Sequence, residues 1–179
     1  MGEKNEWCAR LLLRCTRAPA APALPTAMTR LTENVYLGSA ADARAAVRGE
    51  AAVAFKCLVN MTTSAYEVPG GITVFHVPLR DDSATDITPI IPPLVQLLER
   101  LDKDGSPTLV HCVAGVNRSG AAAMAYLMHR KCADTPGMTA AAKFVFFLRT
   151  YYELRDARGA FLENASFRSQ VIRMFVTGA

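Results

Sequence analysis

One segment of this 179-residue chain gathers residue types that handle phosphate. A short apolar run, residues 108–111, leads into Cys112, a glycine-containing loop and Arg118. An arginine binds phosphate through paired hydrogen bonds, and backbone N–H groups at a helix start add partial positive charge. Such surroundings lower the pKa of a cysteine into a range of about 3.5–7.5. The segment therefore predicts a thiolate placed to attack a bound phosphorus atom.

Each position of this segment has an expected task. We expect Cys112 to be the nucleophile and Arg118 the phosphate ligand. Ser119 is expected either to donate a hydrogen bond to the departing thiolate or to cap the next helix. His111 is expected to orient the loop from behind, as a buried residue. Gly115 allows the tight turn, and the full phosphate-binding loop comprises Val113, Ala114, Gly115, Val116, Asn117 and Arg118.

Strand-like and helix-like segments alternate around this loop. Short apolar runs predict strands at residues 35–38, 55–60, 72–77 and 108–111. Helical spacing and composition predict helices at residues 40–47, 92–105, 119–130, 138–154 and 161–176. The alternation predicts an α/β fold, a single domain with a central, mostly parallel mixed sheet flanked by helices.

The composition is that of a globular protein with a distinct first segment. Hydrophobic residues make up 51% of the chain, and no apolar run has the length of a membrane span. Residues 18–27 are an Ala/Pro run, so residues 1–27 are expected to form a flexible extension and residues 28–179 the catalytic domain. Five cysteines without paired spacing predict reduced thiols and a cytoplasmic location, with the nucleus as the alternative.

A family resemblance rests on several segments. His111-Cys-Val-Ala-Gly-Val-Asn-Arg-Ser119 resembles the signature of cysteine-based protein tyrosine phosphatases, His-Cys-x5-Arg-Ser/Thr. The small size and Val77–Asp82 resemble the dual-specificity branch, as do Asn34–Ser39, Cys57–Asn60 and Glu163–Gln170. The resemblance implies a protein tyrosine phosphatase-like fold. It also implies a protein phosphatase that hydrolyses phosphotyrosine and phosphoserine or phosphothreonine through a cysteinyl-phosphate intermediate, with phosphoprotein substrates and neither metal nor organic cofactor.

The resemblance further implies a carboxyl group that protonates the leaving oxygen. Such an acid must lie on a mobile loop that reaches the site. Asp81 precedes Cys112 by 31 residues and Asp82 by 30, so Asp81 is the first candidate and Asp82 the second. Asp86 is expected to be structural, because aspartates in loops commonly hold turns.

Two other functions stay open at this level. Asn117 followed by Arg-Ser-Gly is similar to the RNA 5′-triphosphatase branch, although Val113-Ala114 replaces the Thr-His pair of that branch. No basic groove is evident beside the loop, so nucleic acid is disfavoured as a partner but left open. A phosphate-binding interaction module with a disabled acid loop would also retain Cys112 and Arg118. The lack of lysines in the loop disfavours inositol lipids.

Overall fold

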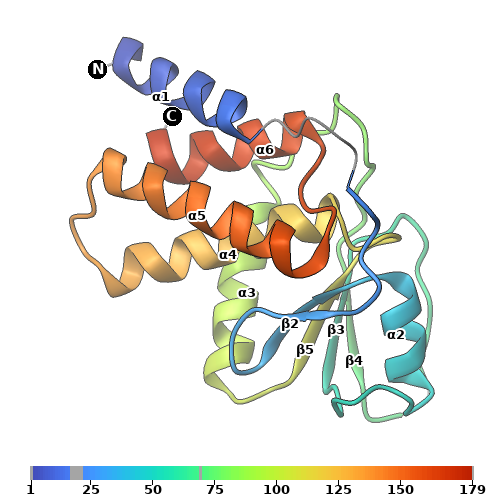
Figure 1. The fold of residues 1–179 in the computed structure, drawn as a ribbon. Coiled ribbons are helices and arrows are strands. Elements are labelled where there is room, and N and C mark those ends of the chain that lie inside the picture. The colour runs from blue at the N-terminus through green and yellow to red at the C-terminus, as the bar shows by residue number, and fades with distance from the viewer. Residues whose placement is uncertain (1, 17–21, 69, 179) are drawn as a thin grey trace.

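A five-stranded sheet carries the fold of the computed structural model, which describes residues 2–16, 22–68 and 70–178 (Figure 1). The strands are β1 (Thr29–Arg30), β2 (Val35–Gly38), β3 (Cys57–Asn60), β4 (Thr73–His76) and β5 (Thr108–His111). The helices are α1 (Gly2–Cys15), α2 (Ala40–Val47), α3 (Ile91–Lys103), α4 (Arg118–Asp134), α5 (Ala140–Arg158) and α6 (Ala165–Ile172), followed by a π-helical turn, η1 (Arg173–Thr177). No helix within these described ranges has the length and hydropathy needed to cross a membrane.

The strand that leads into the cysteine loop lies in the middle of the sheet. The strand order is β1-β2-β5-β3-β4; β5 pairs in parallel with β2 and β3, and β1 is antiparallel to β2. In this register Gly38 and Asn60 flank His111. The carboxyl ends of the parallel strands thus meet at one edge, which is where open α/β sheets bind ligands. The predicted mostly parallel mixed sheet is confirmed.

The two faces of the sheet bury different sets of side chains. Leu58 of β3 and Leu109 of β5 belong to a cluster with α2, whereas Val59 and Val110 belong to the larger cluster formed with the other helices. This division follows from the alternation of side chains along a strand. Figure 1 shows α2 on one face of the sheet and the layer of α3 to α6 on the other. Because both faces are covered, β3 and β5 are buried along their whole length.

Local signals set several helix boundaries. α2 begins after Ser39, whose hydroxyl accepts the Asp42 N–H at 3.3 Å while the Asp42 carboxylate accepts the Ser39 N–H at 2.7 Å. This reciprocal pair is a capping box. The helix predicted at residues 161–176 starts later, at Ala165. Leu162 has a φ of +51°, which a right-handed helix does not accept, and the side chain of Asn164 caps α6 instead.

The N-terminal segment differs from the expected flexible extension. Residues 2–15 form α1, which packs on α5, α6 and η1 (Figure 1). Ala9, Leu12 and Thr16 are buried, and the Thr16 carbonyl accepts a hydrogen bond from Tyr151 at 3.0 Å. The partners of α1 lie more than a hundred residues away in the chain, so this packing could not be predicted from a local sequence pattern. Residues 22–27 form neither helix nor strand, as the Ala/Pro run predicted, and residues 17–21 lie outside the described chain.

Candidate active site

The loop that follows β5 turns back sharply to the start of α4. Gly115, at the turn, has a φ of +72°, and a Cβ atom there would lie 2.7 Å from the backbone oxygen of Gly38. A left-handed φ disfavours side chains, and the short distance leaves no space for one. Glycine is therefore required at position 115 both by the backbone conformation and by the close approach of β2.

The carbonyl groups of the loop are held from outside. The oxygens of Val113, Gly115 and Val116 accept hydrogen bonds from Ala40 N, Arg158 Nη1 and Leu162 N at 3.1, 2.7 and 2.9 Å. In a trans peptide the N–H points opposite to the C=O. Anchoring these oxygens outward therefore turns the N–H groups toward the inside of the loop, where they form an anion-binding cup.

Cys112 lies at the base of this cup and is 2% exposed. Burial alone would raise the pKa of the Cys112 thiol, but hydrogen bonds from Ser119, the charge of Arg118 and the Val116 N–H outweigh it. The pKa of Cys112 therefore lies below its ordinary value, which favours the thiolate. Ser119 Oγ lies 3.2 Å from Cys112 Sγ, within hydrogen-bond distance of the sulfur, and Asn117, not Ser119, occupies the N-cap position of α4.

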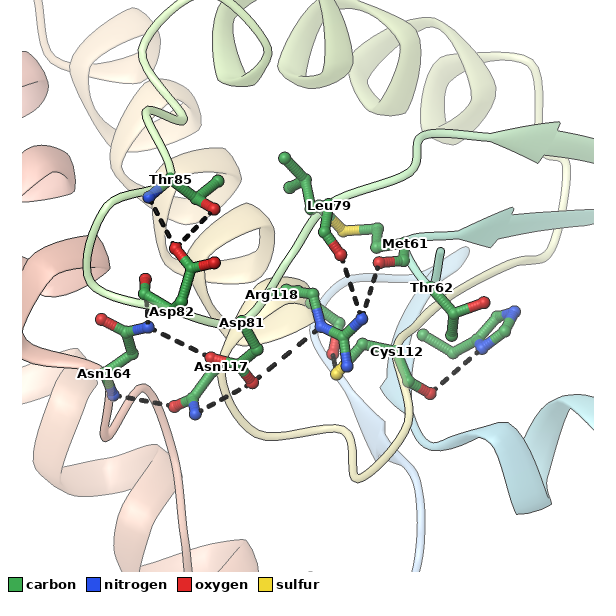
Figure 2. A network of polar contacts seen from close by, with 12 residues as sticks. Met61, Thr62, Leu79, Asp81, Asp82, Thr85, Cys112, Asn117, Arg118 and Asn164 are labelled. Carbon is green, nitrogen blue, oxygen red and sulfur yellow. Dashed lines mark hydrogen bonds and ion pairs between the residues drawn. The ribbon is translucent and has the colours of Figure 1, made fainter. Parts of the chain in front are cut away.

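Arg118 is the first residue of α4 and is 8% exposed. Its Nη1 donates to the carbonyl oxygens of Leu79 at 3.1 Å and Met61 at 3.4 Å (Figure 2). Its Nε lies 3.9 Å from the Asp81 carboxylate and has no hydrogen-bond partner in the part of the chain that the structure describes. A buried donor without a protein partner remains available to a ligand acceptor. The guanidinium is thus oriented by backbone groups and keeps a donor for a phosphate oxygen.

Asp81 points toward this site from the acid loop, residues 79–88. Its two carboxylate oxygens accept hydrogen bonds from two different amides, Asn117 Nδ2 at 3.2 Å and Asn164 Nδ2 at 3.1 Å (Figure 2). Together with the ion pair to Arg118 these contacts place the Asp81 carboxylate beside the phosphate-binding loop. The structure therefore brings the first candidate for the general acid to the cysteine loop.

The other two aspartates of the acid loop hold turns. One Asp82 oxygen accepts hydrogen bonds from the hydroxyl and the N–H of Thr85, each at 2.8 Å, and these bonds lower the pKa of Asp82. Asp86 accepts equivalent bonds from the hydroxyl and N–H of Thr88, at 2.7 and 2.9 Å. Both are the side-chain-to-backbone turns that aspartates favour in loops. Asp86 therefore holds a turn, as expected for a structural aspartate, and Asp82 does the same.

His111 is the last residue of β5, next to Cys112, and is 1% exposed. Its Nε2 is 2.6 Å from the Tyr66 hydroxyl, and its Nδ1 is 3.3 Å from the Cys112 carbonyl oxygen. Burial lowers the pKa of His111, although the bond to Cys112 and the charge of Asp42 oppose this shift. A neutral ring fits this geometry, with Nδ1–H donating to Cys112 and Nε2 accepting from Tyr66.

Sequence reasoning missed Arg158, at the end of α5. It is 7% exposed, and besides binding the Gly115 carbonyl its Nε donates to Thr29 Oγ1 at 3.1 Å. Arginines in a last turn suit the negative end of a helix, and Arg155 lies there as well, so the residue type of Arg158 indicated no further role. Gly115 precedes it by 43 residues, and only the fold brings the two together.

The lowered pKa of the buried Cys112 favours a nucleophilic thiolate. Arg118 beside it can bind a phosphate, and Asp81 can supply a proton. This combination is typical of the cysteine-dependent phosphatases. The comparisons with known proteins agree. The model of the dual specificity phosphatase catalytic domain matches residues 35–176. The chain therefore belongs to the dual-specificity phosphatase family, and it is a dual-specificity protein phosphatase.

Poxvirus and human proteins are among its relatives. The structure of OH1 from the Orf virus is 66% identical, with a TM-score of 0.93 over 95% of this chain and 98% of that one. The variola virus dual specificity protein phosphatase OPG106 is 43% identical over 167 residues, 93% of this chain and 92% of its own length. The structure of human DUSP28 is 25% identical, with a TM-score of 0.67 over 89% of this chain and 98% of that one. The predicted family and fold are confirmed.

Proposed function

We propose that the chain dephosphorylates phosphotyrosine and phosphoserine or phosphothreonine in proteins by way of a cysteinyl phosphate on Cys112, with Asp81 as the general acid. One observation carries the proposal: Arg118, in the same loop as Cys112, places its Nε 3.9 Å from the Asp81 carboxylate of the acid loop. The charge of Arg118 also helps to lower the pKa of Cys112. The proposed nucleophile, phosphate ligand and proton donor thus belong to one site, as phosphoryl transfer requires.

In the first step the thiolate of Cys112 attacks phosphorus. An S–P bond forms while the bond from phosphorus to the ester oxygen breaks, and Asp81 gives its proton to the departing phenol or alcohol. Arg118 and the N–H groups of residues 113–118 stabilise the equatorial oxygens, where negative charge gathers in the transition state.

In the second step water attacks the cysteinyl phosphate. Asp81, now a carboxylate, takes the proton of the water while the new P–O bond forms and the S–P bond breaks. The electron pair returns to sulfur, and Ser119, 3.2 Å away, stabilises the restored thiolate with its hydroxyl. Inorganic phosphate leaves. His111 is a positioning residue in this scheme, since it holds the Cys112 backbone and faces away from substrate.

The proposal includes a metal-free, cofactor-free reaction in a reducing compartment, the cytoplasm. The chemistry of the nucleophile supports the proposal of a reducing compartment, because a cysteine thiolate can attack phosphorus only while it is not oxidised. All five cysteines are unpaired in the structure, including the partly buried Cys8, Cys15 and Cys132. The substrates proposed here are phosphoproteins, with nucleic acid disfavoured.

The test compares wild type with Cys112→Ser on an aryl phosphate, in reductant and chelator. We expect turnover in wild type and none in the variant, with Cys132→Ser, a thiol away from the site, as the matched control. Acid quenching of the wild-type reaction with labelled substrate is expected to trap phosphate on Cys112. Turnover by Cys112→Ser would contradict the mechanism. Faster release of phosphate from RNA 5′-triphosphate than from phosphopeptides would contradict the substrate class.

A further inference from the structure

Asn117 stands at the N-cap position of α4 but its side chain does not cap that helix. Asparagine is among the most favoured N-cap residues, because its side-chain oxygen accepts a backbone N–H of the first turn. Within the described residues Asn117 makes no such bond, and its backbone is helical, with φ −96° and ψ −65°. The first N–H groups of α4 are thus not covered by Asn117, which suits a helix start that must bind an anion.

The Asn117 amide instead joins three segments of the chain. Its Nδ2 donates to Asp81 of the acid loop at 3.2 Å, and its Oδ1 accepts the backbone N–H of Asn164 at 2.8 Å. Asn164 in turn donates from Nδ2 to the other Asp81 oxygen and to the Asp82 carbonyl, both at 3.1 Å (Figure 2). The two amides and the one carboxylate form a closed ring of hydrogen bonds at the mouth of the site.

The start of α6 holds the rest of the acid loop as well. Ser166 Oγ donates to the Ser83 carbonyl at 3.0 Å. Gln170 donates to the Thr85 carbonyl at 3.0 Å and accepts the Ile87 N–H at 2.8 Å. The acid loop is therefore bound along its length to α6, and Asn117 is the residue of the phosphate-binding loop that connects this assembly to the cysteine.

We propose that Asn117, with Asn164, is a positioning residue that sets where the Asp81 carboxyl group stands relative to the leaving oxygen. The inference rests on the proposed role of Asp81 as the general acid. Proton transfer needs donor and acceptor within hydrogen-bond reach, and a misplacement of about 1 Å costs up to roughly a hundredfold in rate. Asn117 and Asn164 each hold one oxygen of the partly exposed Asp81 carboxylate, and together they therefore control the proton transfer.

The test measures kcat/KM of Asn117→Ala with two aryl phosphates. Phenyl phosphate has a basic leaving group, with a pKa near that of tyrosine, about 10, and needs an acid. A difluorinated methylumbelliferyl phosphate leaves as a stable anion and needs it far less. We expect Asn117→Ala to lose roughly ten- to a hundredfold with phenyl phosphate and several-fold less with the fluorinated ester. Equal losses with both esters would overturn the proposal.

Two further variants separate positioning from folding. Asn164→Asp keeps the oxygen that caps α6, where Asn164 Oδ1 accepts from Ser166 N at 3.0 Å, but replaces the donor with a carboxylate that repels Asp81. We expect the same loss, selective for phenyl phosphate. In an Asp81→Ala background, Asn117→Ala is expected to add no further loss with phenyl phosphate, because its effect passes through Asp81. Additive losses would contradict the inference.

A binding measurement controls for distortion of the cup. Inorganic vanadate is held by the loop N–H groups and Arg118, so Asn117→Ala is expected to bind it with affinity within about threefold of wild type. Vanadate binding that falls as far as kcat/KM would show a structural role and overturn the inference. If Asp81→Ala lowers kcat/KM equally for both esters, the assignment of Asp81 as the general acid is wrong. If Asp81→Ala lowers kcat/KM mainly for phenyl phosphate but Asn117→Ala does not, only the inference about Asn117 is wrong.

Discussion

Ser119 Oγ lies 3.2 Å from Cys112 Sγ, with both side chains buried at the junction of the phosphate-binding loop and α4. The contact opposes the effect of burial on the thiol. A buried cysteine in apolar surroundings would have a raised pKa, as Cys57 on β3 does. The hydroxyl of Ser119, its N–H and the Arg118 charge reverse that direction at Cys112. One serine thus helps to keep a desolvated sulfur in its reactive form.

Ser119→Ala is expected to raise the pKa of Cys112, because the largest stabilising contact to the thiolate is removed. The nucleophile is the deprotonated form, so kcat/KM rises with pH through this pKa and its acid limb should move to higher pH. The pH dependence of iodoacetamide alkylation at Cys112 measures the same quantity directly. An unchanged alkylation profile would show that Ser119 does not tune the thiol. Cys57, buried and of raised pKa, is the unreactive reference.

Asp81→Asn and Asp82→Asn are a matched pair at adjacent positions. Asp81→Asn removes the proposed acid and is expected to lower kcat/KM for phenyl phosphate by roughly 10²- to 10⁴-fold. Asp82→Asn keeps an oxygen that accepts from Thr85 and is expected to stay within a few-fold of wild type. Steady-state kinetics with phenyl phosphate decide between them. A larger loss in Asp82→Asn would reverse the assignment.

Gly115→Ala and Gly137→Ala separate two costs of a side chain. Both glycines have a left-handed φ, +72° and +76°, which costs alanine about 1–2 kcal/mol. At Gly137 nothing lies within 4 Å of the new Cβ, whereas at Gly115 the Gly38 oxygen lies at 2.7 Å. We expect Gly137→Ala to lose about 1–2 kcal/mol in urea unfolding and to keep its activity. Gly115→Ala should lose more stability and most of its activity, and equal behaviour of the two would contradict this reading of the loop.

Tyr66→Phe tests the support of the cysteine loop from behind. It removes the 2.6 Å bond to His111 while keeping the ring, and a buried hydrogen bond contributes about 1 kcal/mol to stability. Burial raises the pKa of Tyr66 to about 12, so the hydroxyl stays protonated over the working pH range. We expect lower stability in urea and a modest fall in kcat, with vanadate binding retained. A variant as stable as wild type would show that the contact contributes nothing.

Leu12→Ala tests the packing of α1. Leu12 is fully buried, so truncation is expected to cost about 2–5 kcal/mol of unfolding free energy. Trp7 on the same helix is 64% exposed, and Trp7→Ala is expected to change stability by less than about 0.5 kcal/mol. Urea unfolding of the full chain compares the two. An unaffected Leu12→Ala variant would return residues 2–15 to the status of a flexible extension.

Much of the fold and part of the site follow from local patterns. Three elements have their predicted bounds: the strands at residues 35–38 and 108–111 and the helix at residues 40–47. Their signals are local, because a short buried strand is a run of adjacent apolar residues and the capping box joins Ser39 to Asp42. Gly115 was predictable for the same reason, since a turn of this kind needs a left-handed residue. The strand β1 was not predicted, because its two residues, Thr29 and Arg30, are too few to show an alternation of apolar and polar side chains.

The sequence by itself determined the chemistry, and the tertiary structure decided its placement. The residues that indicate the chemistry all lie within nine consecutive positions: His111, Cys112, Gly115, Arg118 and Ser119. Their types and spacing are therefore enough to predict one loop and the reaction that it supports. Which neighbouring aspartate faces that loop was not decidable from a spacing of 31 against 30 residues. The structure turns Asp81 inward because Asn117 and Asn164, 36 and 83 residues away, bind its carboxylate. Contacts over such separations form only when the sheet brings loop ends together, and no local pattern encodes them.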